Sequence, residues 1–249
     1  MIGTIAWREL RSLFLSPLAW AILAVVQLLI GFMFLARINI VQMYASQLAA
    51  MEEAPGVTEI IVPELLGTAA IVLLLVVPLI TMRLLAEERR NKTLALLYSA
   101  PVSMTEIVLG KYLGVLGFLG IVVLLIGVMP ASLVFGGALD VGLLTSGLLG
   151  LTLVLASFTA VGLFMSALTQ HPAVAAIATF GALLLFWILD WSGQGPQGAS
   201  VLAYLSLFNH YKPFLDGLFD SADALYHLLL IGAFLVLSIR RLDADRLGG

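Results

Sequence analysis

Side chains able to carry out catalysis are scarce in this sequence and widely separated along it. The three histidines, His171, His210 and His227, form no H-E-x-x-H pair of the kind that binds zinc. Gly110-Lys111 is followed by Tyr112 where a phosphate-binding loop has Ser or Thr, and the upstream glycine of such a loop is missing. The absence of cysteine excludes disulfides, thiol catalysis and thiolate metal sites. We therefore expect no catalytic residue, no metal site and no nucleotide hydrolysis on this polypeptide.

The strongest concentration of charge lies between residues 86 and 101. A run of charged and polar residues is followed there by an apolar stripe: Glu87, Glu88, Arg89, Arg90, Asn91 and Lys92, then Leu94, Leu97 and Tyr98. A short amphipathic helix of this kind can dock into a groove on a soluble partner. A solvated loop whose arginines bind lipid head groups fits the same residues, so the pattern alone leaves both interpretations open.

The composition shows which elements must position these residues. Of the 249 residues, 61% are hydrophobic and only 11% are charged, whereas soluble domains carry about 25% charged residues. Apolar runs of roughly 18 residues or more, almost free of charge, recur along the chain and are typical of transmembrane helices. We therefore expect an all-α, multi-pass membrane protein that forms a single domain over residues 1–249.

Six transmembrane helices follow from the apolar runs and their boundary signals. Pro17 suits the first turn of a helix, Ser103 and Glu106 form a capping box, and Gln170-His171-Pro172 interrupts the pattern. The spans are expected at 17–38, 65–85, 105–135, 141–168, 173–191 and 222–239. Residues 39–64, 86–101 and 192–221 are expected to be loops, and residues 240–246 a charged tail. Within the last loop, residues 201–208 and 213–219 are apolar but too short to span, which predicts re-entrant or interfacial helices.

The first 15 residues are expected to form a helix in the plane of the membrane. A helical wheel puts Thr4, Arg8 and Arg11 on one face, and Trp7 lies on the other, at head-group depth. The rest of this apolar arc comprises Ile2, Ala6, Leu10, Leu13 and Phe14. Because Arg8, Glu9 and Arg11 interrupt the apolar run, we expect the segment to be retained and not removed as a signal peptide.

The basic residues predict the orientation of the chain. Six spans place both termini on one side, and only Arg37 and Lys212 lie on the other. The basic residues on the terminal side are Arg8, Arg11, Arg83, Arg89, Arg90, Lys92, Lys111, Arg240, Arg241 and Arg246. By the positive-inside rule both termini are cytoplasmic, in a bacterial inner membrane. The centres of spans three to five carry no ionisable residue, and Asp190 at an outer end is expected to reach water, so the energy source is expected on another chain.

Two parts of the sequence resemble type-2 ABC transporter permeases. After the second span the matching stretches are Ala86-Glu87-Glu88-Arg89-Arg90-Asn91-Lys92-Thr93-Leu94, Leu97-Tyr98-Ser99-Ala100-Pro101-Val102-Ser103 and Glu106-Ile107-Val108-Leu109-Gly110-Lys111-Tyr112. Asn91-Lys92 stands where the family commonly has Gly. Further along, the residues similar to the gliding-motility (GldF) and nitrous-oxide-reductase-maturation (NosY) branch are Leu205-Ser206-Leu207-Phe208-Asn209-His210-Tyr211, Phe214, Gly217, Asp220 and the ending Arg240-Arg241-Leu242-Asp243.

The resemblance implies a set of roles and partners. Glu87–Tyr98 would be a cytoplasmic coupling helix, residues 1–15 an interface helix with Trp7, Arg8 and Arg11, and Val201–Phe219 an external gate region. The gate residues implied are Leu205, Phe208, Asn209, His210, Tyr211, Phe214 and Asp216. Permeases of this family work as dimers, of two copies or of two paralogues, on cytoplasmic ATP-binding subunits that hold ATP and magnesium. A periplasmic accessory subunit and membrane lipid are further expected partners; nucleic acid is not.

The function expected from these observations is that of an exporter permease working by alternating access. An apolar path favours amphipathic, lipid-like or peptide cargo. Two alternatives remain open: a permease that serves maturation of a periplasmic metalloenzyme, and a membrane scaffold that binds a cytoplasmic partner without transport. An intramembrane hydrolase would need a nucleophile or metal pair in mid-membrane, and the sequence shows none.

Overall fold

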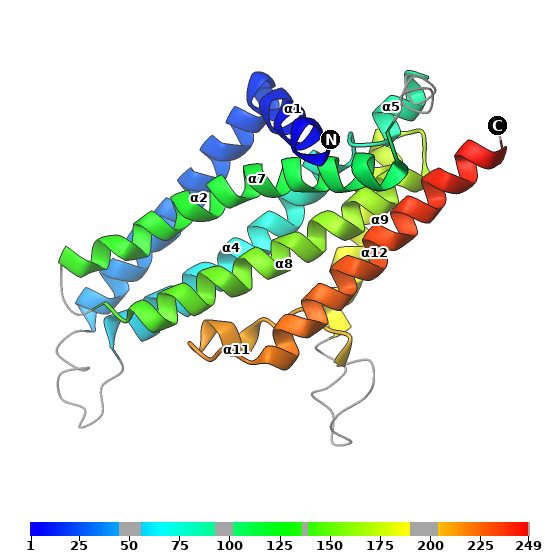
Figure 1. Cartoon of the computed structure of the whole chain (residues 1–249). Coiled ribbons are helices and arrows are strands. Elements are labelled where there is room, and N and C mark those ends of the chain that lie inside the picture. The colour runs from blue at the N-terminus through cyan, green and yellow to red at the C-terminus, as the bar shows by residue number, and fades with distance from the viewer. Residues whose placement is uncertain (45–55, 93–101, 136–138, 190–203, 249) are drawn as a thin grey trace.

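The computed structural model is a bundle of helices (Figure 1). It describes residues 1–44, 56–92, 102–135, 139–189 and 204–248. Every regular element in these ranges is helical. In chain order they are α1 (Ile2–Leu15), α2 (Pro17–Met43), α4 (Val57–Thr81), α5 (Ala86–Arg90), α7 (Met104–Ala131), a 3₁₀ turn (Ser132–Phe135), α8 (Val141–Leu168), α9 (Pro172–Ile188), α11 (Lys212–Leu215) and α12 (Ser221–Gly248).

Five helices in the described ranges are long and apolar enough to cross a membrane. They are α2, α4 continued into α5, α7 with its 3₁₀ turn, α8 and α12. The predicted fifth span corresponds to α9, an apolar helix of 17 residues that is followed by residues outside the described ranges. The multi-pass membrane fold is thereby confirmed, and the sixth span stays a prediction.

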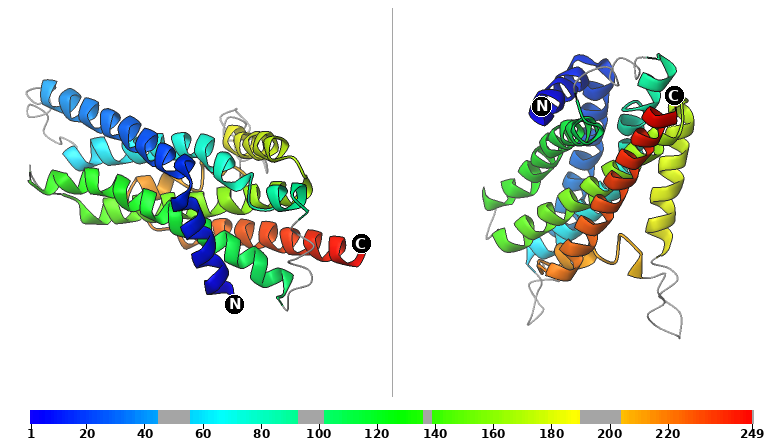
Figure 2. Two further views of the ribbon diagram at one scale, coloured as in Figure 1. Left: turned by 90° about the horizontal axis from the view of Figure 1, so that it is seen from above. Right: turned by 45° about the vertical axis from the view of Figure 1, so that its right-hand side comes forward.

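The helix α8 is the centre of the bundle. It contacts α4, α7, α9, α11 and α12, and Figure 2 shows these helices around it in two further views. Phe158 on α8 and Phe118 on α7 are among the largest fully buried side chains. Each long helix satisfies its own backbone hydrogen bonds, as lipid requires, and α8 is the most enclosed of the five.

Two helix starts are fixed by local capping, and the sequence predicted the one at Ser103 and Glu106. The Glu106 N–H donates to Ser103 Oγ at 3.2 Å, and the Ser103 N–H donates to Glu106 Oε2 at 3.0 Å. Asp140 Oδ1 accepts from the Leu143 N–H at 3.0 Å at the start of α8. Both helices therefore begin within one residue of their predicted starts at 105 and 141.

The prediction of a loop over residues 39–64 was wrong at both ends, because both ends are helical. The first span continues to Met43, and α4 begins at Val57, where the Glu59 carboxylate accepts from the Gly56 N–H at 3.2 Å. Thr58, Ile61 and Val62 are buried at helical spacing, and Arg37 forms an ion pair with Glu64. Glu59 and Glu64, two of the acidic residues that resemble a loop in the sequence, therefore lie on helix.

The predicted charged tail at 240–246 is also helical. The helix α12 continues to Gly248, and Leu242 is completely buried within it. Arg241 Nη2 lies 3.4 Å from Asp245 Oδ1 one turn later on the same helix. Both termini lie at one end of the bundle, with α1 and α5 (Figures 1 and 2). We call this the terminal end, and the end that holds α11 the opposite end.

Candidate functional site

At the terminal end, α1 crosses α7 at two glycines. A Cβ atom added to Gly110 would lie 2.6 Å from Ile5 Cβ, and one added to Gly114 would lie 2.6 Å from Glu9 Cβ and 2.9 Å from the Ala6 carbonyl oxygen. Side chains at either position would push α1 away, so these glycines permit the close approach. The Gly110-x-x-x-Gly114 spacing, a weak signal by itself, marks the site where the N-terminal helix docks.

The side chain of Lys111 lies at this crossing and is only 3% exposed. Its Nζ atom lies 2.8 Å from Glu88 Oε1 on α5 and 3.3 Å from Glu9 Oε2 on α1. A buried ammonium is tolerated when opposite charges surround it, and removal of those charges is costly. One lysine therefore joins three helices, α1, α5 and α7. We call Glu9, Glu88 and Lys111 the charged junction.

Ser166 on α8 stabilises the turn at residues 82–85, where the helix is interrupted between α4 and α5. Ser166 Oγ accepts hydrogen bonds from the Leu85 N–H at 3.1 Å and the Ala86 N–H at 3.0 Å, and it donates to the Met82 carbonyl oxygen at 3.1 Å. These backbone groups are buried where the helix is interrupted and would otherwise lack partners. A single hydroxyl thus fixes the start of α5 against the central helix.

The helix α5 is also tied to the end of the chain. Arg89 forms an ion pair with Asp245 on α12. Glu87 and Arg90 are the more exposed pair, and Arg90 Nη2 is 3.8 Å from Glu87 Oε1. Of the predicted coupling residues, Glu88 and Arg89 therefore bind other helices, and Glu87 and Arg90 lie at the surface. Leu94, Leu97 and Tyr98 lie outside the described residues.

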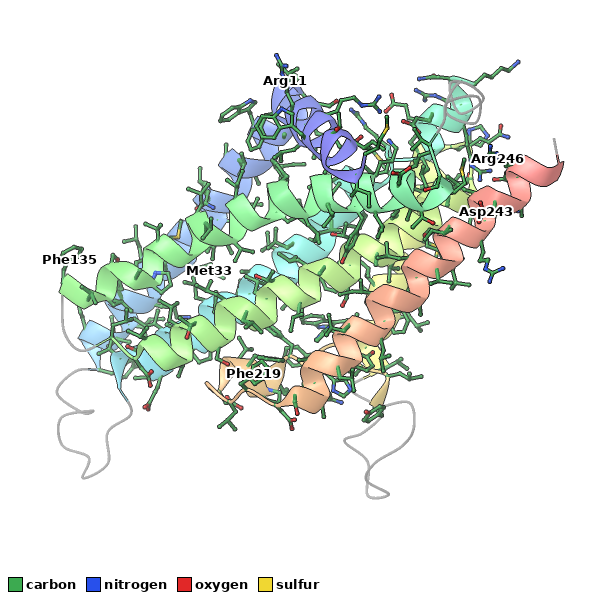
Figure 3. All side chains as sticks on the ribbon, viewed as in Figure 1. Arg11, Met33, Phe135, Phe219, Asp243 and Arg246 are labelled. Carbon is green, nitrogen blue, oxygen red and sulfur yellow. The ribbon has the colours of Figure 1, made fainter. Side chains whose placement is uncertain are left out.

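The helix α1 has the predicted length, and part of the predicted apolar arc packs on the bundle: Leu10, Leu13 and Phe14 lie against the core. Trp7, predicted on the same arc at head-group depth, is 67% exposed, and Arg8 and Arg11 are exposed as well. Figure 3 shows Arg11 pointing away from the bundle. The packed side also includes Ile5 and Glu9. Glu9 was missed as a site residue because its partner, Lys111, is remote in sequence.

At the opposite end, His210 links two segments of the chain. Its Nδ1 lies 2.6 Å from Asp223 Oδ1 on α12, and its Nε2 lies 2.8 Å from the Tyr204 carbonyl oxygen. The imidazole stacks on Tyr226 at 3.9 Å between ring centroids, and the Tyr226 hydroxyl donates to the Leu205 carbonyl oxygen at 2.7 Å. The segment before α11 is thereby attached to the first turns of α12.

Two other predicted gate residues fill the space between α4 and α8. The Tyr211 hydroxyl donates to the Leu66 carbonyl oxygen at 3.2 Å, and burial raises the pKa of Tyr211, so the group stays neutral. A Cβ atom added to Gly150 would lie 2.5 Å from Phe214 Cβ. Tyr211 and Phe214 are both completely buried. They fill space at this end of the bundle, and we call these two side chains the plug.

The remaining gate residues are more peripheral. Phe208 packs on Trp187 at 4.7 Å between ring centroids, and the Asn209 N–H donates to Ser206 Oγ at 3.4 Å. Leu205 and Asp216 are exposed. The helix predicted at 213–219 was wrong beyond Leu215, because Gly217 has a φ of 81°, a left-handed conformation that ends the helix. The helix predicted at 201–208 lies partly outside the described residues.

The fold brings together two histidines that lie apart in sequence. His227 is completely buried on α12, with Nδ1 3.0 Å from Ser157 Oγ on α8. The rings of His210 and His227 both contact Tyr226, at centroid distances of 3.9 and 5.5 Å. His171 lies elsewhere, at the start of α9. Across the described ranges, no three His, Asp or Glu side chains are grouped to hold a metal ion.

Comparison with protein families agrees with this architecture. The family model described as "ABC-2 family transporter protein" matches residues 3–246, which is nearly the whole chain. A comparison with curated proteins finds no match. The matched region includes α1, the charged junction and the plug, and it extends to the last turns of α12. This chain is therefore a member of the ABC-2 family of transporter proteins, a family of membrane transport permeases.

Proposed function

We propose that this chain is the membrane-spanning permease subunit of an ATP-driven exporter. In this proposal a separate ATP-binding subunit, which holds ATP and magnesium, docks at the terminal end. Membership of the ABC-2 family supports the proposal. The observation that carries it is the charged junction, because Lys111 joins the two short helices at the terminal end, α1 and α5, to a long membrane helix.

The orientation follows from the distribution of charge. Ten of the twelve basic residues lie at the terminal end, and only Arg37 and Lys212 lie toward the opposite end. Lys and Arg are enriched in cytoplasmic segments of membrane proteins. The terminal end would therefore face the cytoplasm of a bacterial cell, where ATP is available, and the plug would face the exterior.

The contacts of α5 suggest how force reaches the membrane helices. Ser166 attaches its start to α8, the charged junction attaches it to α1 and α7, and Arg89 attaches it to α12. A partner that pushes on residues 86–101 would move four helices together, because packed interfaces shift as units. Tilting of α4 against α8 would then displace Tyr211 and Phe214 and open a path.

Several parts of the assembly belong to this proposal. We propose six spans, with α9 as the fifth, and a second permease copy or paralogue. The transported substrate would bind through many apolar contacts, since the side chains buried between these helices are mostly apolar. Assignment to the GldF and NosY branch rests on the resemblance of residues 205–220 and 240–243.

The test is affinity purification of the tagged full chain from native membranes in mild detergent. Recovered proteins would be identified by mass spectrometry, and ATP turnover would be measured on the same sample. Recovery of a nucleotide-binding subunit with ATPase activity is the expected result. A preparation that contains the intact chain and no ATPase would contradict the exporter proposal and favour a scaffold.

A further inference from the structure

A cavity of about 400 Å³ lies beneath α1 at the terminal end. It is bounded by α1, α2, α4, α5 and α7. The roles proposed above for the charged junction and the coupling segment do not involve this cavity. One part of its lining is ionic: Arg8, Glu9, Arg83, Glu87, Glu88 and Lys111. Another part is apolar: Leu13, Leu18, Ala19, Ile22, Leu79, Ile80, Leu84 and Phe118.

The ionic lining balances in formal charge but is not fully paired. Three basic and three acidic residues contribute to it. Lys111 is committed to Glu9 and Glu88. Arg8 and Arg83 are exposed, and neither forms an ion pair with another described residue. The lining therefore offers two guanidinium groups and, on Glu87, one carboxylate whose contact with Arg90 is long, at 3.8 Å.

The polarity of the lining changes in order along the chain. Leu79 and Ile80 lie in the last turn of α4, Arg83 follows in the turn after it, and Glu87 lies on α5. Apolar, cationic and anionic groups thus succeed one another as the chain leaves the bundle. A phospholipid with an amine head group presents acyl chain, phosphate and ammonium in the same order. Leu79, which lines the cavity, is also 42% exposed.

We propose that this cavity binds the head group of one phosphatidylethanolamine molecule from the adjacent leaflet. Arg8 and Arg83 bind its phosphate through charge-assisted hydrogen bonds, which guanidinium groups form especially well. Glu87 accepts hydrogen bonds from its primary ammonium. The acyl chains leave past Leu79. The volume lies within the range of small-molecule sites, about 300–1,000 Å³, which suits a head group.

Charge complementarity favours this lipid over the other common phospholipids. Phosphatidylcholine has the same phosphate, but its quaternary ammonium has no N–H to donate to Glu87. Phosphatidylglycerol has no cation at all and would leave Glu87 with only its long contact to Arg90. The site is a property of α1, α4 and α5 in this chain, and it does not depend on the proposed transport function.

The test measures lipid binding to the delipidated full chain in detergent, with native mass spectrometry as the readout. Phosphatidylethanolamine, phosphatidylcholine and phosphatidylglycerol with identical acyl chains would be titrated separately. Loss of one charge-assisted contact corresponds to about a tenfold change in dissociation constant. We expect phosphatidylethanolamine to bind about tenfold more tightly than either other lipid, with one molecule per chain. Equal binding of all three lipids would overturn the proposal.

Variants locate the site. Arg8→Gln with Arg83→Gln should abolish tight binding, whereas the matched control, Arg11→Gln with Arg246→Gln, removes two charges from outside the cavity and should retain it. Glu87→Gln should reduce phosphatidylethanolamine binding to the level of phosphatidylcholine. Because Glu87→Gln is a single change at the surface, it still tests the site if the double variant does not fold. Unchanged lipid preference in Glu87→Gln, or equal loss in the control, would contradict the assignment.

Discussion

Lys111 and Glu88 lie 2.8 Å apart although one belongs to a long membrane helix and the other to the short helix α5. The same ammonium reaches Glu9 on α1 at 3.3 Å. Because a buried ammonium requires compensation, α1 and α5 are each held to α7 by the same charge. This shared charge places the terminal helices where a cytoplasmic partner could move them together.

Replacement of Lys111 by Met should destabilise the protein strongly. Two carboxylates that are mostly buried would lose their counter-charge, which costs about 3–5 kcal/mol for a buried pair. The measurement is thermal unfolding in detergent, monitored through tryptophan fluorescence. Lys111→Arg keeps the charge and should retain most of the stability. Equal unfolding midpoints for Lys111→Met and the wild type would show that the junction contributes nothing.

Substitution of the two crossing glycines should displace α1. Gly110→Ala with Gly114→Ala places methyl groups 2.6 Å from Ile5 and Glu9 atoms, and overpacking of this kind costs about 1–3 kcal/mol. Proteolysis at the N-terminal helix should become faster, with a lower unfolding midpoint. Gly120→Ala on the same helix is the control, since no atom lies within 4 Å of the added Cβ. Similar behaviour of the two variants would refute the close approach.

Loss of the Ser166 hydroxyl should loosen α5. Ser166→Ala leaves the buried N–H groups of Leu85 and Ala86 without their acceptor, at about 1–3 kcal/mol. Hydrogen exchange at residues 85–90 should rise, as measured by mass spectrometry. Thr145→Ala is a suitable control, because Thr145 is exposed and bonds only to carbonyl groups of its own helix. Unchanged exchange in Ser166→Ala would contradict this role.

The long helices could be predicted from the sequence because their signals are local. The capping box at Ser103 and Glu106 and the apolar run after Asp140 each lie within a few residues of the boundary that they determine. The helical segments at Val57–Glu64 and after Arg240 could not be recognised in this way. Their charged residues resemble a loop, and the remote partners, such as Arg37 for Glu64, become visible only in the fold.

The site was predicted less well than the fold, for a related reason. Charge density directed attention to Glu88 and Arg89 as contacts for a partner, whereas both bind other helices of this chain. Glu9 and Ser166 escaped notice because each acts on residues far away in sequence. Gly110 and Gly114 were a usable signal, since a pair of glycines at this spacing predicts a close helix contact even where the contacting helix is unknown.

Replacement of His210 by Ala should release the segment before α11 from α12. The substitution removes the contacts with Asp223 and the Tyr204 carbonyl group, and a hydrogen bond to a charged group is worth about 1.5–3 kcal/mol. Because the chain has no cysteine, a single Tyr204→Cys reporter can be labelled without background, and it should react faster in His210→Ala. His171→Ala is the control. Equal labelling rates would show that His210 does not hold the segment.

The most direct test of the exporter account compares partner capture by two double variants of the tagged chain in native membranes. Leu94→Asp with Leu97→Asp alters the predicted docking stripe, and Asp216→Lys with Asp220→Lys reverses charge at the opposite end. The first variant should insert normally and lose the ATP-binding subunit, and the second should recover it at the wild-type level. Capture of the subunit by the first variant, or its loss from the second, would contradict the account.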